Sequence, residues 1–249
     1  MDEKTHPVFQ GKRKSRSIFF VVIGIVGLIA IHIGFAKTYL MPVANGSFRA
    51  PSIVYIHGVF AFLWILLFFV QSVLIKVNRF NLHRKLGVAS MIVAIGTAVT
   101  TVLIGKYSVE KELGNGLGET AISLIVGTIT SAIMFLSLVI AGYIKRKRAD
   151  THKRLMLLAT IVVLWPAWFR FRHYFPSVPR PDIWFALVLA DSLIIIAWIW
   201  DKLVNGRIHP TLLYVGLFII AEQSFEVWMF DSPGWRVVSN QVYNVLSSG

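Results

Sequence analysis

The sequence predicts an all-α protein, a polytopic bundle of about seven helices that cross a membrane, and three observations predict it. Of the 249 residues, 56% are hydrophobic, and the mean hydropathy is +0.68. The apolar residues come in long runs, and a membrane-crossing helix needs about 20 of them. The runs show no two-residue alternation, so helices rather than a barrel are expected. Seven such helices consume the chain and leave no separate soluble domain.

The helices are placed from the apolar runs and the polar segments between them. The polar start of the chain, 1–16, is interpreted as a basic cytoplasmic tail. No small-residue cleavage site closes the next apolar run, so a retained first span is expected. Residues 17–230 form one transmembrane bundle, and 231–249 form an extracytoplasmic tail. The spans are expected at about 17–38, 51–77, 85–105, 120–144, 153–175, 183–203 and 210–230.

Lysine and arginine collect at alternating ends of the spans. Seventeen of the 25 fall in the N-terminal tail and in the loops after the second, fourth and sixth spans, and eight fall on the other side. Because cytoplasmic loops are enriched in these residues, we expect a cytoplasmic N-terminus and an extracytoplasmic C-terminus in a bacterial inner membrane. The net charge of +13 then needs no nucleic-acid partner. It predicts contact with anionic lipid head groups, made by Arg84, Lys85, Lys153, Arg154 and Arg207.

Ionisable residues inside the spans are candidate functional residues, because such groups are costly in lipid. The helical rise of about 1.5 Å per residue places several in the outer half of the bilayer. Asp191 falls near the middle of the sixth span, and Glu222 and Glu226 lie one turn apart on one face of the seventh. The alternative is that these groups only join helices or lie at the interface. The outer set is His32, His57, Arg170, His173, Asp191, Glu222 and Glu226.

Three histidines form an inner set, because each opens a helix that returns outward from a basic loop. These are His83, His152 and His209. If the helix starts are neighbours, the imidazoles converge on a divalent metal, a haem iron or an anionic head group. The dense basic charge favours an anion, and a basic rim with incidental histidines is the alternative. The chain has no cysteine, which excludes disulfides, thiolate metal sites and cysteine nucleophiles.

Three strings around these histidines are distinctive. They are His83-Arg84-Lys85-Leu86-Gly87, His152-Lys153-Arg154-Leu155-Met156 and Arg207-Ile208-His209-Pro210. With His57, Trp64 and Gln71 they resemble a set of bacterial multi-pass membrane proteins of unassigned activity, over residues 55–215. That resemblance implies a fold and no activity.

A looser similarity is to transmembrane b-type cytochromes with two haems. It implies bis-histidine ligation in an outer layer (His32, His57, His173) and an inner layer (His83, His152). The chain departs from that pattern, because the fourth span has no histidine and Gln71 stands where a second ligand is expected.

The sequence leaves three functions open. The first is binding of haem b or a divalent metal through the histidines. The second is a transporter or proton-coupled channel that uses Asp191 and Glu222. The third is a non-enzymatic scaffold, sensor or assembly factor. No Gly-x-Ser-x-Gly elbow and no His-Glu-x-x-His occur, which removes the common membrane hydrolase and metalloprotease signatures.

Overall fold

The structure, a computed structural model, describes the backbone of residues 7–248 and the side chains of residues 18–248. The described residues contain helices and no strand, and seven helical segments are long and apolar enough to cross a membrane. The predicted all-α polytopic bundle is therefore confirmed, and the chain is an integral membrane protein. The seven segments are Ile18–Ala44, Ser52–Lys76, Phe80–Gly114, Glu119–Lys147, Ala149–His173, Asp182–Asn205 and Pro210–Met229. The side chains of the basic tail expected at 1–16 lie outside the described residues.

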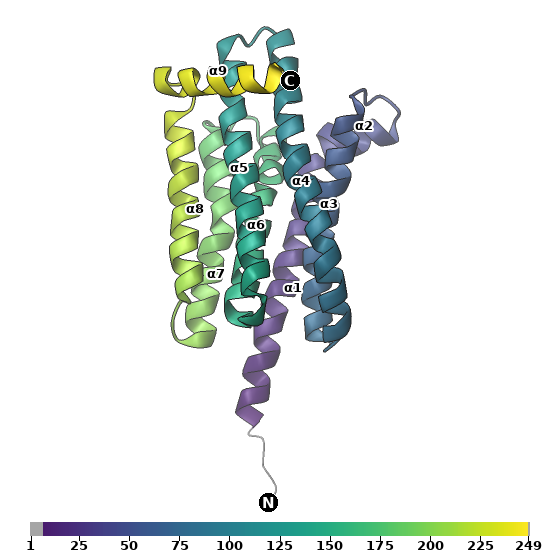
Figure 1. Cartoon of the computed structure of the whole chain (residues 1–249), viewed down its shortest axis with the longest axis vertical. Coiled ribbons are helices and arrows are strands. Elements are labelled where there is room, and N and C mark those ends of the chain that lie inside the picture. The colour runs from purple at the N-terminus through teal and green to yellow at the C-terminus, as the bar shows by residue number, and fades with distance from the viewer. Residues whose placement is uncertain (1–6, 249) are drawn as a thin grey trace, which may run out of the picture.

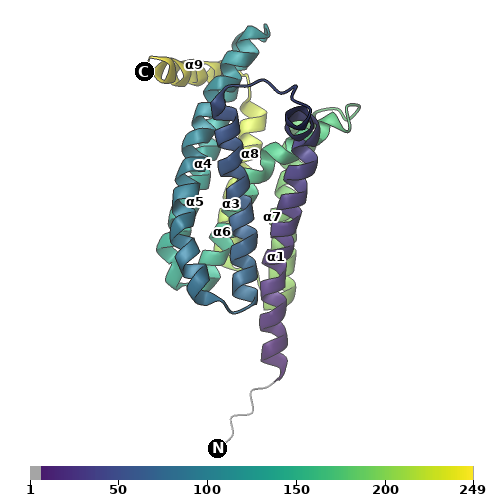
Figure 2. The same ribbon diagram turned by 90° about the vertical axis from the view of Figure 1, so that its right-hand side faces the viewer.

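The helices run up and down through the bundle, joined by short loops (Figure 1). The loops that join α3 to α4, α5 to α6 and α7 to α8 lie at the end from which α1 enters, which we call the inner end; α9 lies at the outer end (Figures 1 and 2). The α-helices are α1 (Pro7–Phe35), α2 (Met41–Ala44), α3 (Ser52–Lys76), α4 (Phe80–Gly114), α5 (Glu119–Ile144), α6 (Ala149–Phe169), α7 (Ala190–Asn205), α8 (Pro210–Met229) and α9 (Pro233–Ser247). Two π-helices, η1 (Ala36–Leu40) and η4 (Asp182–Leu189), and two 3₁₀-helices, η2 (Lys145–Lys147) and η3 (Arg170–His173), extend them.

Helix α6 lies at the centre and packs against α1, α3, α5, α7 and α8. Its Leu158, Ile161 and Leu164 are fully buried. Lipid tails are as apolar as these side chains, so helices in a membrane associate through close packing rather than through hydrophobic burial. At one such contact Gly34 of α1 lies against the backbone of Ala167, where a Cβ atom has no room. The central helix therefore fixes the positions of the polar residues at both of its ends.

Helix α4 is longer than the expected third span at 85–105. It begins at Phe80 and continues to Gly114, so its last turns project past α9 at the outer end (Figure 1). Lys106 and Glu110, four residues apart in these turns, lie 3.9 Å apart. Such pairs support a helix outside the apolar layer, and no proline interrupts the segment.

The residues after the seventh span form a helix, α9, where only a tail was expected. It lies across the outer end, roughly perpendicular to the spans (Figures 1 and 2). Ser232 caps its start, since its hydroxyl accepts the Trp235 N–H at 3.3 Å, and Pro233 occupies the first turn. The Trp235 indole is buried and donates to the Ser123 carbonyl of α5 at 2.9 Å. The helix therefore connects the end of α8 to α5.

Candidate functional site

Asp191 is the most unusual polar residue inside the bundle. It is the second residue of α7, which continues directly from the π-helix η4. Only 5% of Asp191 is exposed, and neither carboxylate oxygen has a hydrogen-bond partner in the described structure. A buried polar group without a partner is costly. Asp191 therefore needs a proton, a cation or ordered water to satisfy it.

Two further carboxylates of α8 lie near Asp191. Glu222 is close enough for its charge to act on Asp191, and Glu226 follows one turn later on the same face. Thr130 of α5 donates its hydroxyl to Glu226. Gly127, one turn before Thr130, leaves room for this carboxylate, since a Cβ there would lie 3.3 Å from the Glu226 Oε2 atom. The acidic cluster Asp191, Glu222 and Glu226 thus collects side chains from α7 and α8 against α5.

No basic side chain neutralises the acidic cluster within the described part of the chain. None of the ion pairs formed by side chains of residues 18–248 includes Asp191, Glu222 or Glu226. Among the described residues, the hydrogen bond from outside the cluster comes from the Thr130 hydroxyl, and a hydroxyl carries no compensating charge. Three acids without a cation in the outer half of the spans suit a site for protons or small cations.

The basic members of the predicted outer set form a second group around α3 and α6. The Thr100 hydroxyl donates to the Gly96 carbonyl at 2.7 Å, so His57 Nδ1 is the donor in its 3.0 Å contact with Thr100. The Arg170 guanidinium lies close enough for its charge to act on His57. It donates a hydrogen bond to the Pro166 carbonyl and lies 4.0 Å from the centre of the Phe35 ring. No hydrogen bond or ion pair between described side chains joins this group to the acidic cluster.

The remaining outer histidines have local roles. His32 Nδ1 donates to the Leu28 carbonyl one turn earlier at 2.8 Å, on an exposed face. The His173 carbonyl accepts from Lys37 at 3.1 Å. The structure therefore brings together three of the seven predicted outer residues as one cluster, and it places the other four elsewhere.

Two of the three inner histidines lie next to each other, with their rings edge to face. The rings of His83 on α4 and His152 on α6 have centroids 6.4 Å apart and planes at 82°. His152 Nδ1 is 2.8 Å from the Gly142 carbonyl, whereas the Nδ1 of His83 is buried without a partner. No other pair of histidine rings is in contact among the described side chains, and no group of three or more His, Cys, Asp or Glu there has metal-binding spacing. Of the histidines predicted to ligate a metal or haem, the structure thus brings only these two together among the described residues.

His209 belongs to a different inner cluster, built around a buried ion pair. Arg154 of α6 is 3% exposed and Asp201 of α7 is 0% exposed, and Arg154 binds both carboxylate oxygens. Asp201 also accepts from Asn205 at 2.5 Å and from the His209 backbone N–H at 2.7 Å. Arg154 was expected to contact lipid head groups; it instead holds the α7–α8 loop against α6. Asp201 was not among the sequence candidates.

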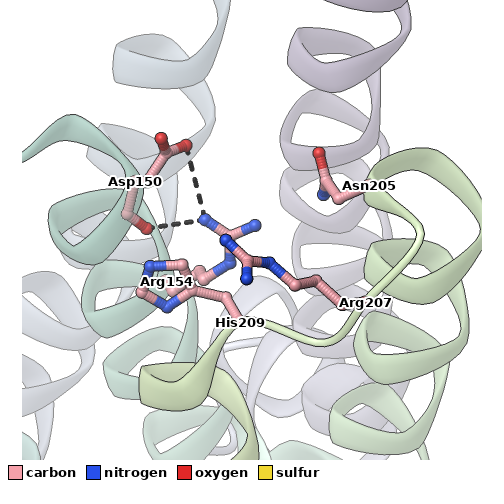
Figure 3. Close-up of a pocket in the computed structure, with 5 residues that line it drawn as sticks. All are labelled: Asp150, Arg154, Asn205, Arg207 and His209. Atoms are coloured by element: carbon pink, nitrogen blue, oxygen red, sulfur yellow. Dashed lines mark hydrogen bonds and ion pairs between the residues drawn. The ribbon is translucent and has the colours of Figure 1, made fainter.

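A pocket of about 210 Å³ opens beside this ion pair. Figure 3 shows the His209 ring and the Arg207 side chain on one side of Arg154, with Asp150 on the other. The His209 Nδ1 accepts the Thr211 N–H at 3.2 Å, so its proton is on Nε2. Burial lowers the pKa of His209 below its usual value, and the Arg154 charge adds to this, so both effects favour the neutral ring. The Asp150 carboxylate accepts a hydrogen bond from the Lys153 ammonium group at 2.5 Å.

The other basic residues expected at lipid head groups lie at the inner end. Arg84 and Lys85 are exposed, and Arg84 donates to the Asn81 side chain at 2.6 Å. Arg207 is exposed at the rim of the pocket. Contact of these residues with anionic lipid stays a prediction.

Comparison with known proteins assigns no family: no family model, no curated protein and no solved structure matches the chain. The resemblances to bacterial multi-pass proteins and to dihaem cytochromes therefore stay predictions. Function has to be argued from the clusters themselves.

Proposed function

We propose that this integral membrane protein is a transporter or channel coupled to protons or to a small monovalent cation such as Na⁺, which binds at the acidic cluster. The observation that supports this most is Asp191, which is almost completely buried and whose two oxygens have no partner. An acid in the interior of a span is a functional-site candidate by default.

The composition of the cluster supports an exchangeable ion rather than a structural role. A structural carboxylate in this protein has donors on each oxygen, as Asp201 does through Arg154, Asn205 and His209. Asp191 has none, and Glu222 and Glu226 add negative charge to its surroundings. A proton or Na⁺ removes this repulsion and satisfies the free oxygens. An ion bound this way can leave when the site changes shape.

The helix that carries Asp191 supports such a change of shape. The eight residues before α7 form the π-helix η4, and Asp191 follows the transition to α-helical geometry. π-Helical segments are rare and are frequent at functional sites, and transporters commonly place their ion sites at interruptions of spanning helices. A shift between π and α hydrogen bonding would rotate Asp191 relative to Glu222.

The test is ion flux in proteoliposomes. Purified full-length chain is reconstituted with a pH dye or a Na⁺ dye inside, and a valinomycin-driven K⁺ diffusion potential is imposed. We expect the wild type to take up H⁺ or Na⁺ faster than empty liposomes, and Asp191→Asn to reduce the rate at least tenfold. Glu110→Gln, at an acid in the projecting end of α4 whose side chain is 50% exposed, is the matched control and should leave the rate unchanged.

A second measurement separates ion binding from folding. A carbodiimide that reacts with protonated carboxyl groups in apolar surroundings should label Asp191 or Glu226, as located by mass spectrometry, and Na⁺ should slow the labelling if Na⁺ is the coupling ion. Equal flux in the wild type and in Asp191→Asn would overturn the proposal. So would an absence of labelling in the cluster together with a wild-type flux no faster than that of empty liposomes.

We further infer that the inner end faces the cytoplasm of a bacterial inner membrane. The support is the distribution of charge, with 17 of 25 lysines and arginines assigned to that side. The loops concerned lie together at the inner end (Figure 1). A reporter enzyme that works only outside the cytoplasm should be active when it is fused after the C-terminal residue, and a reporter that works only in the cytoplasm should be inactive there. Activity of a cytoplasmic reporter there would overturn the orientation.

A further inference from the structure

We propose a metal site at the inner end, where α3, α4 and α6 meet, that takes an imidazole-preferring transition ion of the Cu²⁺ or Zn²⁺ class. Its ligands are His83, His152 and the amide oxygen of Gln71. It lies apart from the acidic cluster and does not depend on the transport proposal.

His152 is held in the orientation of a metal ligand. Its Nδ1 lies 2.8 Å from the Gly142 carbonyl, and a carbonyl only accepts, so the proton is on Nδ1. The Nε2 atom therefore carries a free lone pair. A ligating histidine typically donates its second ring N–H to a carbonyl or carboxylate in this way, which fixes the tautomer and the ring direction.

His83 offers a second free imidazole opposite. Its Nδ1 is buried without a hydrogen-bond partner, and its ring centroid is 6.4 Å from that of His152. A Zn²⁺–N bond is about 2.0–2.1 Å, and the ring centroid lies roughly 1 Å beyond the nitrogen. One ion reaches both rings at the observed separation when the two nitrogens lie on opposite sides of it, as in a tetragonal Cu²⁺ site. A tetrahedral Zn²⁺ would draw the two rings about 1 Å closer together.

Gln71 supplies an oxygen from α3. Its Nε2 donates to the His83 carbonyl at 3.1 Å, which fixes the amide, since the reverse orientation would bring two oxygens together. The Oε1 atom is then directed away from that carbonyl, and it is buried without a partner. The Gln71 Oε1 on α3 and the His83 Nδ1 on α4 are thus both buried without a partner, and the Gln71 side chain is bonded to the His83 backbone. With the His83 proton on Nε2, a cation satisfies both atoms, whereas an anion leaves the Gln71 oxygen unsatisfied.

The nearby basic residues do not prevent a cation from binding. Lys153 is paired with Asp150 at 2.5 Å, which compensates its charge, and Arg84, bonded to Asn81 at 2.6 Å, is exposed to solvent that screens its charge. The ligands are two imidazoles and one neutral oxygen, a set that suits Cu²⁺ or Zn²⁺ rather than Mg²⁺ or Ca²⁺, which prefer carboxylate and water oxygens.

The experiment uses the full chain without a histidine tag, in nanodiscs, titrated with Cu²⁺ and, separately, with Zn²⁺. We expect one ion per chain, and an electron paramagnetic resonance spectrum of bound Cu²⁺ that shows coupling to imidazole nitrogens. His83→Ala and His152→Ala should each weaken binding at least tenfold, and Gln71→Leu by a smaller factor. His32→Ala and His209→Ala are matched controls and should bind as the wild type does.

Several results would overturn the metal site. One is wild-type affinity in the His83→Ala/His152→Ala double variant. Another is a Cu²⁺ spectrum of the wild type without nitrogen coupling, a measurement that needs no variant to fold. A Soret band in the protein as purified would assign the pair to haem instead. Because Asp191→Asn should bind the metal normally, failure of this proposal and failure of the transport proposal are distinguishable.

Discussion

The buried ion pair between Arg154 and Asp201 gives the sharpest stability prediction. Arg154→Met keeps most of the side-chain length and removes the charge. It takes away the Nε and Nη2 donors and leaves a carboxylate that is 0% exposed with donors from Asn205 and His209 only. Breaking a buried pair by removing one partner costs about 3–5 kcal/mol, because an uncompensated charge stays inside.

The double variant Arg154→Met/Asp201→Leu should be more stable than Arg154→Met alone. Removing both charges eliminates the uncompensated carboxylate. The main group left unpaired is the His209 backbone N–H, which now donates to Asp201 at 2.7 Å. An unsatisfied buried donor costs about 1–3 kcal/mol. We therefore expect the double variant to lie between the wild type and the single variant.

The assay is equilibrium unfolding in mild detergent, followed by circular dichroism as the fraction of denaturing detergent rises. Glu110→Gln breaks the exposed Lys106–Glu110 pair on α4 and serves as the control. Exposed pairs four residues apart on a helix contribute about 0.3–0.5 kcal/mol. The reasoning would be refuted if Arg154→Met lowered the free energy of unfolding by no more than this control does. It would also be refuted if the double variant lowered that free energy by as much as the two single variants added together.

Three further predictions concern α9 and the packing of α1. Trp235→Ala removes a buried indole and its hydrogen bond to α5. Truncating a large buried aromatic side chain lowers the free energy of unfolding by about 3–5 kcal/mol, so amide hydrogen exchange across α9 should become faster. Unchanged exchange would contradict the docking of α9 on α5. The Arg236 guanidinium is the main group that holds the pKa of Asp231 well below its usual range. A lowered folded-state pKa gives stability that is complete above the unfolded value of about 4 and is lost as the pH falls towards the folded value. At pH 3, where pepsin is active, Arg236→Met should therefore be cut in α9 faster than the wild type, and equal rates of cutting would contradict this. Gly34→Ala places a Cβ where the α6 backbone leaves no room and should lower the thermal midpoint, whereas Gly114→Ala, with open space around it, should leave it unchanged.

The spans could be predicted because their signal is local. A run of apolar residues long enough to cross lipid identifies a helix whatever surrounds it. The ends of α4 and α9 lack that signal. The projecting turns of α4 are polar, and α9 is fixed by the contact of Trp235 with Ser123, 112 residues earlier in the chain. Such a contact becomes visible only once the helices are packed.

The candidate sites could be predicted in part for the same reason. Asp191, Glu222 and Glu226 stand out as acids in apolar helices, and the structure places them together. Their separation from His57 and Arg170 depends on the rotation of each helix about its axis, which hydropathy does not give. Asp201 resembled an ordinary interface residue, because its partner is 47 residues away. The sequence marks Gln71 as part of a resemblance and as an interruption of a ligand pattern, whereas its unpartnered Oε1 atom is visible only in the packed structure.

The way α9 closes the outer end affects how the acidic cluster can move. Asp231, at the junction of α8 and α9, accepts the hydroxyls of Thr120 and Ser123 of α5, each at 2.8 Å. Deeper in the bundle, Thr130 of α5 is bonded to Glu226. Helix α8 is thereby bonded to α5 at two heights, which would favour movement of the two glutamates together with α5. Asp191 sits on a separate helix, so sliding α7 past α5 and α8 is the motion that would open or close the gap between the carboxylates.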